Sequence, residues 1–222
     1  MTKTGLRLVS APIAPLWRGP TGSARDDRVT EALAGEPLLV TGEPSQGRIP
    51  VVAPWQPSSL ATNGYPGWVD AHRLGDSPSA APALAVASSV LPHDSDDPVD
   101  LARHLLGTPY VWGGLSAEGI DCSGLVHLVH RELRRIVPRD ARDQGASLAP
   151  VPLTDVRRGD LYLFARPGRS VHHVAFVVEP SLLGPGVVLH ASDGDGGVVE
   201  GPLDAERTAT LAGAARAALD LR

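Results

Sequence analysis

The segment from residue 76 to residue 97 constrains the fold most, because it divides the chain into two parts of different character. It is rich in Ala, Ser and Pro and has no sustained helical or strand period, which is typical of a surface linker between domains. The 222 residues, 42% of them hydrophobic, suffice for one mid-sized domain or two small ones. We expect a domain at 1–75, a linker at 76–97 and a second domain at 98–222.

The first part, to about Leu74, is punctuated by Pro and Gly, and its apolar runs are short. These runs are Leu38–Val40, Ile49–Ala53 and Gly67–Val69. Short strands between turns predict a small β-barrel.

The second part predicts an α+β domain. Pro98 precedes apolar residues at helical spacing, so a helix is expected there that ends at Gly107. A second helix is expected from Cys122, because apolar residues recur after it at three- and four-residue spacing. Apolar segments between turn signals then predict antiparallel strands, and the Ala-rich end from Asp204 to Arg222 predicts a terminal helix.

Charge limits the classes of partner. The formal net charge is −5 and the pI is about 5.9, so the attraction that drives binding to nucleic acid or to an anionic membrane is missing. A small, peptidic partner is favoured over both. The N-terminus lacks the apolar run of a secretory signal, and no later stretch has the roughly 20 apolar residues that span a bilayer. We therefore expect a cytoplasmic protein.

The chain has a single cysteine, Cys122. One cysteine excludes an intramolecular disulfide framework and any multi-cysteine zinc site, which leaves either a small core residue or a reactive thiol. A helix N-terminus presents unpaired N–H groups and the positive end of the peptide dipoles, and both lower a thiol pKa. A nucleophile at Cys122 is therefore consistent with its predicted position.

Two histidines can complete a catalytic group. His173 opens one predicted strand and can act as the base, and His190 lies near the end of the next strand, where it can orient that base. Each of these residues also fits a purely structural role. We expect His127 and His130 to be solvated or to support the site from outside, and His172 to point to the opposite face from His173.

Five motifs in a fixed order strengthen the catalytic interpretation. The chain contains GTPYVWGG, DCSGLV, RRGDLYLF, HVAFVV and LHAS between Gly107 and Ser192. In this order they resemble the motif set of the NlpC-type cysteine peptidases, a resemblance that covers about residues 98 to 200. It implies a papain-like domain, with helices packed on an antiparallel sheet, in which Cys122 is the nucleophile, His173 the base and His190 the orienting residue. Ala175 replaces the usual Gly, a change of one methyl that the strand should tolerate.

The same resemblance places Tyr110 beside the nucleophile. Its phenol could bind the thiolate or help to hold the oxyanion, together with the backbone N–H of Cys122; simple packing of the ring is the alternative. Gly113–Gly114 would let the backbone approach a substrate closely. Asp160, after a turn glycine, is expected to cap backbone N–H groups and to be structural.

The first domain resembles the bacterial SH3-like barrels that precede NlpC domains. In the muropeptide-recycling enzymes with this arrangement, a free L-Ala amine is held by acidic and polar side chains. The resemblance assigns that substrate-binding role here to Asp121, Ser123, Asp140, Tyr65 and Glu31. The alternative is that Asp121 caps its helix and that Asp140 is a solvated turn residue.

The expected activity is therefore hydrolysis of the γ-D-glutamyl–diamino acid bond of muropeptides with a free N-terminal L-Ala, with no metal and no cofactor. Alternatives are a peptidase for intact, cross-linked peptidoglycan, a non-catalytic peptidoglycan-binding module, and a zinc site built from the same three side chains. The zinc alternative lacks a CxxC or HExxH spacing. The sequence does not decide between lysine and diaminopimelate at the third stem position.

Overall fold

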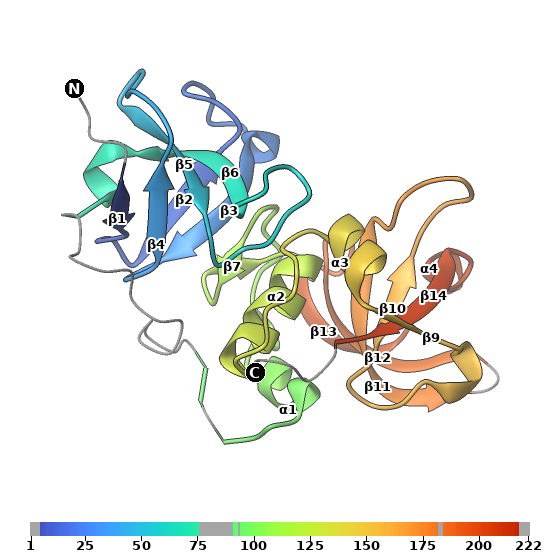
Figure 1. The fold of residues 1–222 in the computed structure, drawn as a ribbon. Helices are drawn as coiled ribbons and strands as arrows, with labels where there is room; N and C mark the ends of the chain where they lie inside the picture. Colours follow the sequence, from blue (N-terminus) through green and yellow to red (C-terminus); the bar gives the residue numbers. More distant parts are fainter. Residues whose placement is uncertain (1–4, 76–90, 93, 182–183, 218–222) are drawn as a thin grey trace. The chain divides into compact units, whose positions relative to one another are not determined.

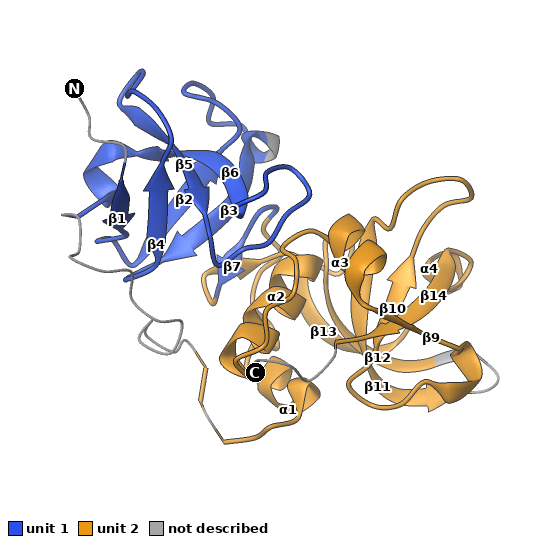
Figure 2. Ribbon diagram, viewed as in Figure 1, with its two compact units in different colours: residues 1–89, 112–116 blue, residues 90–111, 117–222 orange. Residues whose placement is uncertain are grey.

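The computed structural model describes residues 5–75, 91–92, 94–181 and 184–217 (Figure 1). The chain divides into two compact units, of which unit 1 comprises residues 1–89 and 112–116 and unit 2 the remainder (Figure 2). Most of the predicted linker lies outside the described residues, so its conformation and the predicted domain boundaries stay predictions.

Unit 1 contains a six-stranded antiparallel sheet with the order β1-β4-β5-β6-β2-β3. Ala14 and Leu16 in β2 are fully buried and alternate with less buried neighbours, as expected for a strand with one face on a core. The predicted short apolar runs are strands β4, β5 and β6. That the sheet forms an SH3-like barrel stays a prediction. The strands are β1 (Leu6–Leu8), β2 (Ile13–Trp17), β3 (Arg28–Leu33), β4 (Pro37–Val40), β5 (Arg48–Ala53) and β6 (Tyr65–Asp70).

The segment 112–116 groups with unit 1, although the sequence assigned it to the second domain. Its strand β7 (Leu115–Ser116) contacts β3, and Arg28 Nε donates to the Trp112 carbonyl at 3.1 Å. Gly113 has φ +71°, and a Cβ there would lie 3.1 Å from the Arg28 carbonyl oxygen. Its backbone conformation and the close packing within unit 1 therefore both favour glycine at this position.

Unit 2 combines helices with a six-stranded antiparallel sheet of order β13-β12-β11-β10-β14-β9, which confirms the predicted α+β class. Helix α2 contacts β11 and β12, and α1 contacts α2 and the same strands. Helix α1 ends at Arg103, before the predicted stop at Gly107. Among the described residues, no helix is long and apolar enough to cross a membrane. The elements are α1 (Pro98–Arg103), β8 (Gly119–Ile120), α2 (Cys122–Glu132), α3 (Ala141–Ser147), β9 (Ala149–Val151), β10 (Leu161–Phe164), β11 (His173–Ser181), β12 (Gly184–Ser192), β13 (Gly197–Pro202), α4 (Ala205–Thr208) and β14 (Leu211–Arg216).

The predicted C-terminal helix is wrong over its described part. Residues 211–216 form β14, which pairs with β10 on one side and β9 on the other, and only the short α4 precedes it. Ala214 and Ala215 are buried in the sheet, and Arg216 forms an ion pair with Asp160 at 2.6 Å. Tertiary pairing therefore overrides the helix propensity of alanine. Residues 218–222 lie outside the described part.

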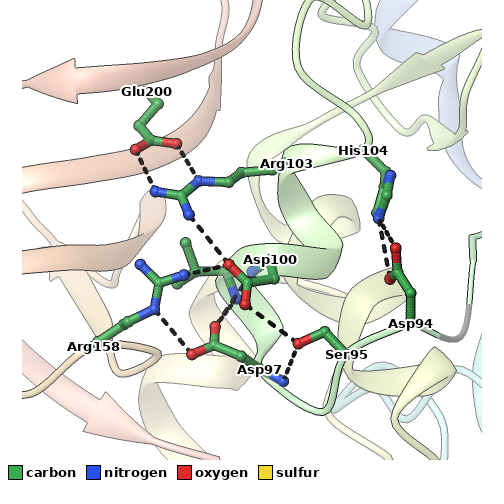
Figure 3. A network of polar contacts seen from close by, with 9 residues as sticks. Asp94, Ser95, Asp97, Asp100, Arg103, His104, Arg158 and Glu200 are labelled. Atoms are coloured by element: carbon green, nitrogen blue, oxygen red, sulfur yellow. Dashed lines mark hydrogen bonds and ion pairs between the residues drawn. The ribbon is translucent and has the colours of Figure 1, made fainter.

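A polar network fixes α1 to the rest of unit 2 (Figure 3). Asp97 caps the helix by accepting the Val99 N–H at 2.7 Å, and Arg158 pairs with Asp97 at 2.9 Å and with Asp100 at 2.6 Å. Arg103 donates two hydrogen bonds of 2.8 Å to Glu200 on β13. These groups are partly exposed, so each pair stabilises the fold modestly, and their geometry mainly positions the helix.

Candidate active site

Cys122 is the first residue of α2, as predicted, and it is 6% exposed. Backbone hydrogen bonds from Val174 and Ser123 and the charge of Arg139 favour its thiolate. Burial and the carboxylate of Asp121 outweigh them and raise the thiol pKa to about 12. The expectation that the helix N-terminus yields a low thiol pKa is therefore wrong, because the site is desolvated and carries an acidic cap. The resting group is a neutral thiol.

His173 and His190 lie on neighbouring antiparallel strands. Phe176 of β11 pairs with Leu189 of β12, so His190 lies opposite Ala175 and diagonally across from His173 on one face of the sheet. The Nε2 atom of His173 and the Nδ1 atom of His190 are 2.8 Å apart, and both side chains are buried, at 5% exposure. The sheet register therefore brings together the two imidazoles that the sequence pairs.

The protonation of this pair follows from its surroundings. Burial lowers the pKa of His173 well below 6.5 and that of His190 to about 4, and the charge of Arg207 is the next cause for both. Both rings are therefore neutral at pH 7. A proton on His173 Nε2, donated to His190 Nδ1, leaves His173 Nδ1 with a lone pair. The other nitrogen of His190 lies 4.0 Å from a carboxylate oxygen of Asp195.

A cavity of about 390 Å³ in unit 2 is lined in part by His173 and by the half-buried Tyr110. His172 also lines it and is exposed. Because His172 precedes β11, the strand alternation on which its expected direction rested does not apply to it, and that expectation stays a prediction. A smaller recess of about 230 Å³ is lined by His190, Asp195 and Arg207, among others.

Asp121 and Ser123 are held in a buried network. The Asp121 carboxylate caps α2 by accepting the Gly124 N–H at 2.7 Å, and it accepts two hydrogen bonds from Arg139, of 2.9 and 2.8 Å. Ser123 donates to Asp121 at 3.2 Å and accepts from Arg139 at 3.1 Å. The capping role of Asp121, which was the alternative interpretation, is thus confirmed.

The other residues assigned to the amine are placed as follows. Asp140 is half-buried, directly before α3, so it is not a fully solvated turn residue. Glu31 on β3 is buried and accepts from Arg28 at 2.7 Å and from the Leu115 N–H at 2.9 Å. Tyr65 opens β6 and lies in the hydrophobic core cluster of unit 1.

Two further histidines are buried, which contradicts one of the two roles expected for them. His127 and His130 are each 1% exposed, so neither is solvated. His127 Nδ1–H donates to the Val137 carbonyl at 2.8 Å, whereas neither ring nitrogen of His130 has a hydrogen-bond partner among the described residues. Burial lowers both pKa values to about 3. They belong to the packing of α2 against the sheet, where His130 contacts Phe176.

Asp160 is structural, as predicted. Its carboxylate accepts the Arg157 N–H at 2.9 Å and also pairs with Arg216. The described part of the chain contains no group of three His, Cys, Asp or Glu side chains arranged to hold a metal ion. Sequence reasoning missed Arg139, Asp195 and Arg207, because an arginine or a turn aspartate carries no spacing signal of its own. Only the position of Arg139 next to Asp140 pointed toward the site.

Comparison with known proteins decides the family. Residues 107–211, which include all three candidate catalytic residues, match the NlpC/P60 family. The chain is 30% identical over 217 residues to the γ-D-glutamyl-L-lysine dipeptidyl-peptidase of Bacillus subtilis (strain 168), covering 73% of this chain and 71% of that protein. The chain belongs to the NlpC/P60 family.

Other NlpC/P60 relatives agree. The chain is 33% identical over 111 residues to the peptidoglycan endopeptidase RipB of Mycobacterium tuberculosis, covering 44% of this chain and 43% of that protein. A crystal structure of an NlpC/P60 family protein from Bacillus cereus superposes with a TM-score of 0.81 at 20% identity, covering 96% of this chain and 99% of that chain. This similarity shows a common fold along nearly the whole chain.

Proposed function

We propose that this NlpC/P60 protein is a cysteine endopeptidase that hydrolyses the γ-D-glutamyl–diamino acid bond of muropeptides with a free N-terminal L-Ala. The observation that carries the proposal is the 2.8 Å hydrogen bond between His173 Nε2 and His190 Nδ1, beside a thiol that hydrogen-bonds the backbone of Val174. The named activity of the Bacillus subtilis relative supports this choice of bond.

The neutral thiol and neutral imidazoles support general-base catalysis rather than a resting ion pair. In the proposed first step, the thiol proton moves to His173 Nδ1 as Cys122 Sγ attacks the γ-carbonyl carbon of D-glutamate. When the C–N bond breaks, His173 returns this proton to the leaving amine of the diamino acid. His190 holds the ring and the tautomer that both transfers require.

The second step hydrolyses the thioester. His173 takes a proton from water as the water oxygen attacks the carbonyl carbon. This proton then moves to Sγ as the C–S bond breaks, and the released γ-carboxylic acid loses its own proton to solvent. In both steps the negative charge on the carbonyl oxygen needs donors already in place. We assign that role to the backbone N–H of Cys122 and the hydroxyl of Tyr110, whose side chain lines the cavity with His173.

Recognition of the L-Ala amine is the finer part of the proposal. Asp140, Asp121 and Ser123 supply acidic and polar groups in unit 2, and the contribution of Tyr65 and Glu31 from unit 1 stays a prediction. Because Arg139 already neutralises Asp121, Asp140 is the carboxylate of unit 2 on which the ammonium should depend most. Acetylating the amine should raise the barrier by about 2–5 kcal/mol, since the substrate would lose its positive charge and its charge-assisted hydrogen bonds to the half-buried carboxylate of Asp140.

Mass spectrometry of the products from defined tri- and tetrapeptide stems, each with a free and an acetylated amine, tests the proposal. We expect cleavage only after D-glutamate, with the free-amine stems strongly preferred, and Asp140→Asn should reduce mainly the free-amine rate. Equal rates on both sets would indicate a general peptidoglycan endopeptidase. Cleavage at another bond would refute the proposed specificity.

The nucleophile has its own test. Cys122→Ala should abolish hydrolysis and keep the circular dichroism spectrum, because the residue contributes little volume to the core. Wild-type activity should survive EDTA and be lost to iodoacetamide; loss in EDTA with rescue by metal would favour a metal site instead. Activity of Cys122→Ala near the wild-type rate would end the proposal.

We also propose that the protein acts in the cytoplasm, in murein recycling. The support is the proposed preference for a free L-Ala amine, which suits released fragments rather than intact peptidoglycan. Fractionation of cells that produce the native protein, followed by immunoblotting, checks the location; recovery outside the cytoplasm would contradict it.

A further inference from the structure

Arg207 lies beside the candidate catalytic histidines and pairs with no carboxylate among the residues that the structure describes. Its side chain lines both the 390 Å³ cavity with His173 and the recess with His190. The guanidinium makes one long contact, from Nη2 to Ser192 Oγ at 3.5 Å, and forms no ion pair with any described residue. After burial, its charge is the largest cause of the lowered pKa of His173 and His190.

The backbone of Arg207 is held in place, so the side chain is presented from a fixed point. Its N–H donates to the Asp204 carboxylate at 2.6 Å, and its carbonyl accepts from the Thr210 hydroxyl at 2.9 Å. Asp204 is thus occupied by the backbone of the short turn that carries Arg207. A half-buried guanidinium that is positioned in this way, and that forms no ion pair within the described part of the chain, is suited to an anionic ligand.

The lining of the cavity carries both signs of charge. Arg166 and Arg207 line the cavity, and carboxylates are supplied by Asp193, Asp204 and Glu206. Arg166 is exposed and also forms no ion pair within the described ranges. A diamino acid carries both carboxylate and ammonium groups, so the mixed lining matches its chemistry better than it matches an apolar or purely anionic ligand.

The position of the cavity relative to the amine-binding residues sets the direction of the substrate. Asp121, Ser123 and Asp140 are not among the described residues that line it, whereas His173 is. The base must reach the amine that leaves, so a cavity bounded by His173 and separate from the L-Ala end fits the leaving side of the scissile bond.

We propose that Arg207, supported by Arg166, binds a carboxylate of the diamino acid whose amine is released by cleavage. This inference rests on the proposed function and adds a subsite to it. The carboxylate could be the α-carboxylate of a terminal lysine or diaminopimelate, or the side-chain carboxylate that only diaminopimelate has. A planar guanidinium fork binds either one with two parallel hydrogen bonds.

The test compares three stems that begin with L-Ala-γ-D-Glu and differ in the third residue: free lysine, lysine α-amide and diaminopimelate α-amide. We expect wild-type kcat/KM to be about 10- to 100-fold lower for lysine α-amide than for the preferred carboxylate form. A preference for free lysine identifies the α-carboxylate as the ligand, and a preference for diaminopimelate α-amide identifies the side chain. Arg207→Gln should make the three rates about equal, and Arg169→Gln, on a nearby exposed arginine, should keep the wild-type ratios.

The ratio of kcat/KM between stems separates carboxylate binding by Arg207 from an effect of Arg207 on the histidines. A shift of the His173 or His190 pKa in Arg207→Gln would change all three rates together and leave the ratio unchanged. Equal losses on all stems would overturn the inference, as would equal wild-type rates on the three stems; in the latter case the proposed function would stand. Calorimetric binding of the same stems to Cys122→Ala gives a readout that needs no cleavage. If the wild type cuts none of the stems after D-glutamate, the proposed function fails. In that case the subsite stands only if Cys122→Ala still binds the carboxylate stems more tightly and the double variant Cys122→Ala, Arg207→Gln loses this preference.

Discussion

Two arginines of unit 2 illustrate two uses of the same charge. Arg139, in the segment between α2 and α3, is 1% exposed and donates two hydrogen bonds to Asp121. Arg207, on α4, is half-buried, and within the described ranges its guanidinium makes one contact, of 3.5 Å, with Ser192. Removing a charge from water costs several kcal/mol unless it is paired. We call the group formed by Asp121, His127, His130 and Arg139 the α2 side of the site, and the group formed by His173, His190, Asp195 and Arg207 the α4 side. On the α2 side the arginine is neutralised by the protein's own carboxylate, whereas on the α4 side the arginine is available to a ligand.

The histidines follow the same division. His127 and His130 on α2 are buried in packing and do not line the cavity. His173 and His190 are equally buried but line the cavity and the recess. We therefore expect changes at His127, His130 and Arg139 to act mainly on stability, and changes at His173, His190 and Arg207 to act mainly on activity.

The largest expected effect is on the α2 side. Arg139→Gln should lower the free energy of unfolding by about 3–5 kcal/mol, because Asp121 is left as a buried, uncompensated charge. Arg207→Gln is the matched control and should cost less than about 1 kcal/mol. Urea denaturation of the full chain measures both values. Equal destabilisation by the two variants would remove the distinction between the arginines.

Acid stability gives the next largest effect. In the unfolded chain His127 and His130 take up protons below pH 6.5, whereas the folded state keeps them neutral down to about pH 3. Proton uptake therefore favours unfolding as the pH falls through this range, by about 1.4 kcal/mol per pH unit for each residue.

His130→Leu should remove one of these two contributions, so the free energy of unfolding should depend less steeply on pH by about 1.4 kcal/mol per unit between pH 6 and pH 5. Denaturant titrations at each pH give the slopes. An unaltered slope in His130→Leu would show that His130 is protonated in the folded protein.

On the α4 side, His190→Ala should lower kcat by about 10- to 100-fold, because the base loses the hydrogen bond that fixes its tautomer. His190→Asn and His190→Gln should retain more activity, since an amide can supply that bond. Steady-state kinetics with one muropeptide compares the three variants. Equal losses in all three would argue against an orienting role.

The smallest effect is expected at Asp195. Its carboxylate is 54% exposed and 4.0 Å from His190 Nε2, so Asp195→Asn should lower kcat by less than about threefold. It should also shift the acid limb of the pH–rate profile to lower pH, because Asp195 raises the His190 pKa. A loss as large as that of His190→Ala would make Asp195 a full partner of the pair.

Local sequence patterns were enough to predict the elements that carry the three candidate catalytic residues. The start of a helix at Cys122 follows from apolar residues at helical spacing, and the antiparallel strands that carry His173 and His190 follow from short apolar runs between turns. These features depend on residues near one another in the chain, which is why periodicity and turn signals predict them.

The sequence by itself thus determined the order of elements, the single thiol at a helix start and the two histidines on successive strands. Only the tertiary structure decided that residues 211–216 form a strand and that Arg139 neutralises Asp121. It also decided that Arg207 lies beside His173 and His190 with no ion pair to any residue that the structure describes. Finally, it decided that the Cys122 thiol is neutral. Pairing, burial and charge at these positions depend on groups distant in the chain, and desolvation exists only once those groups have packed together.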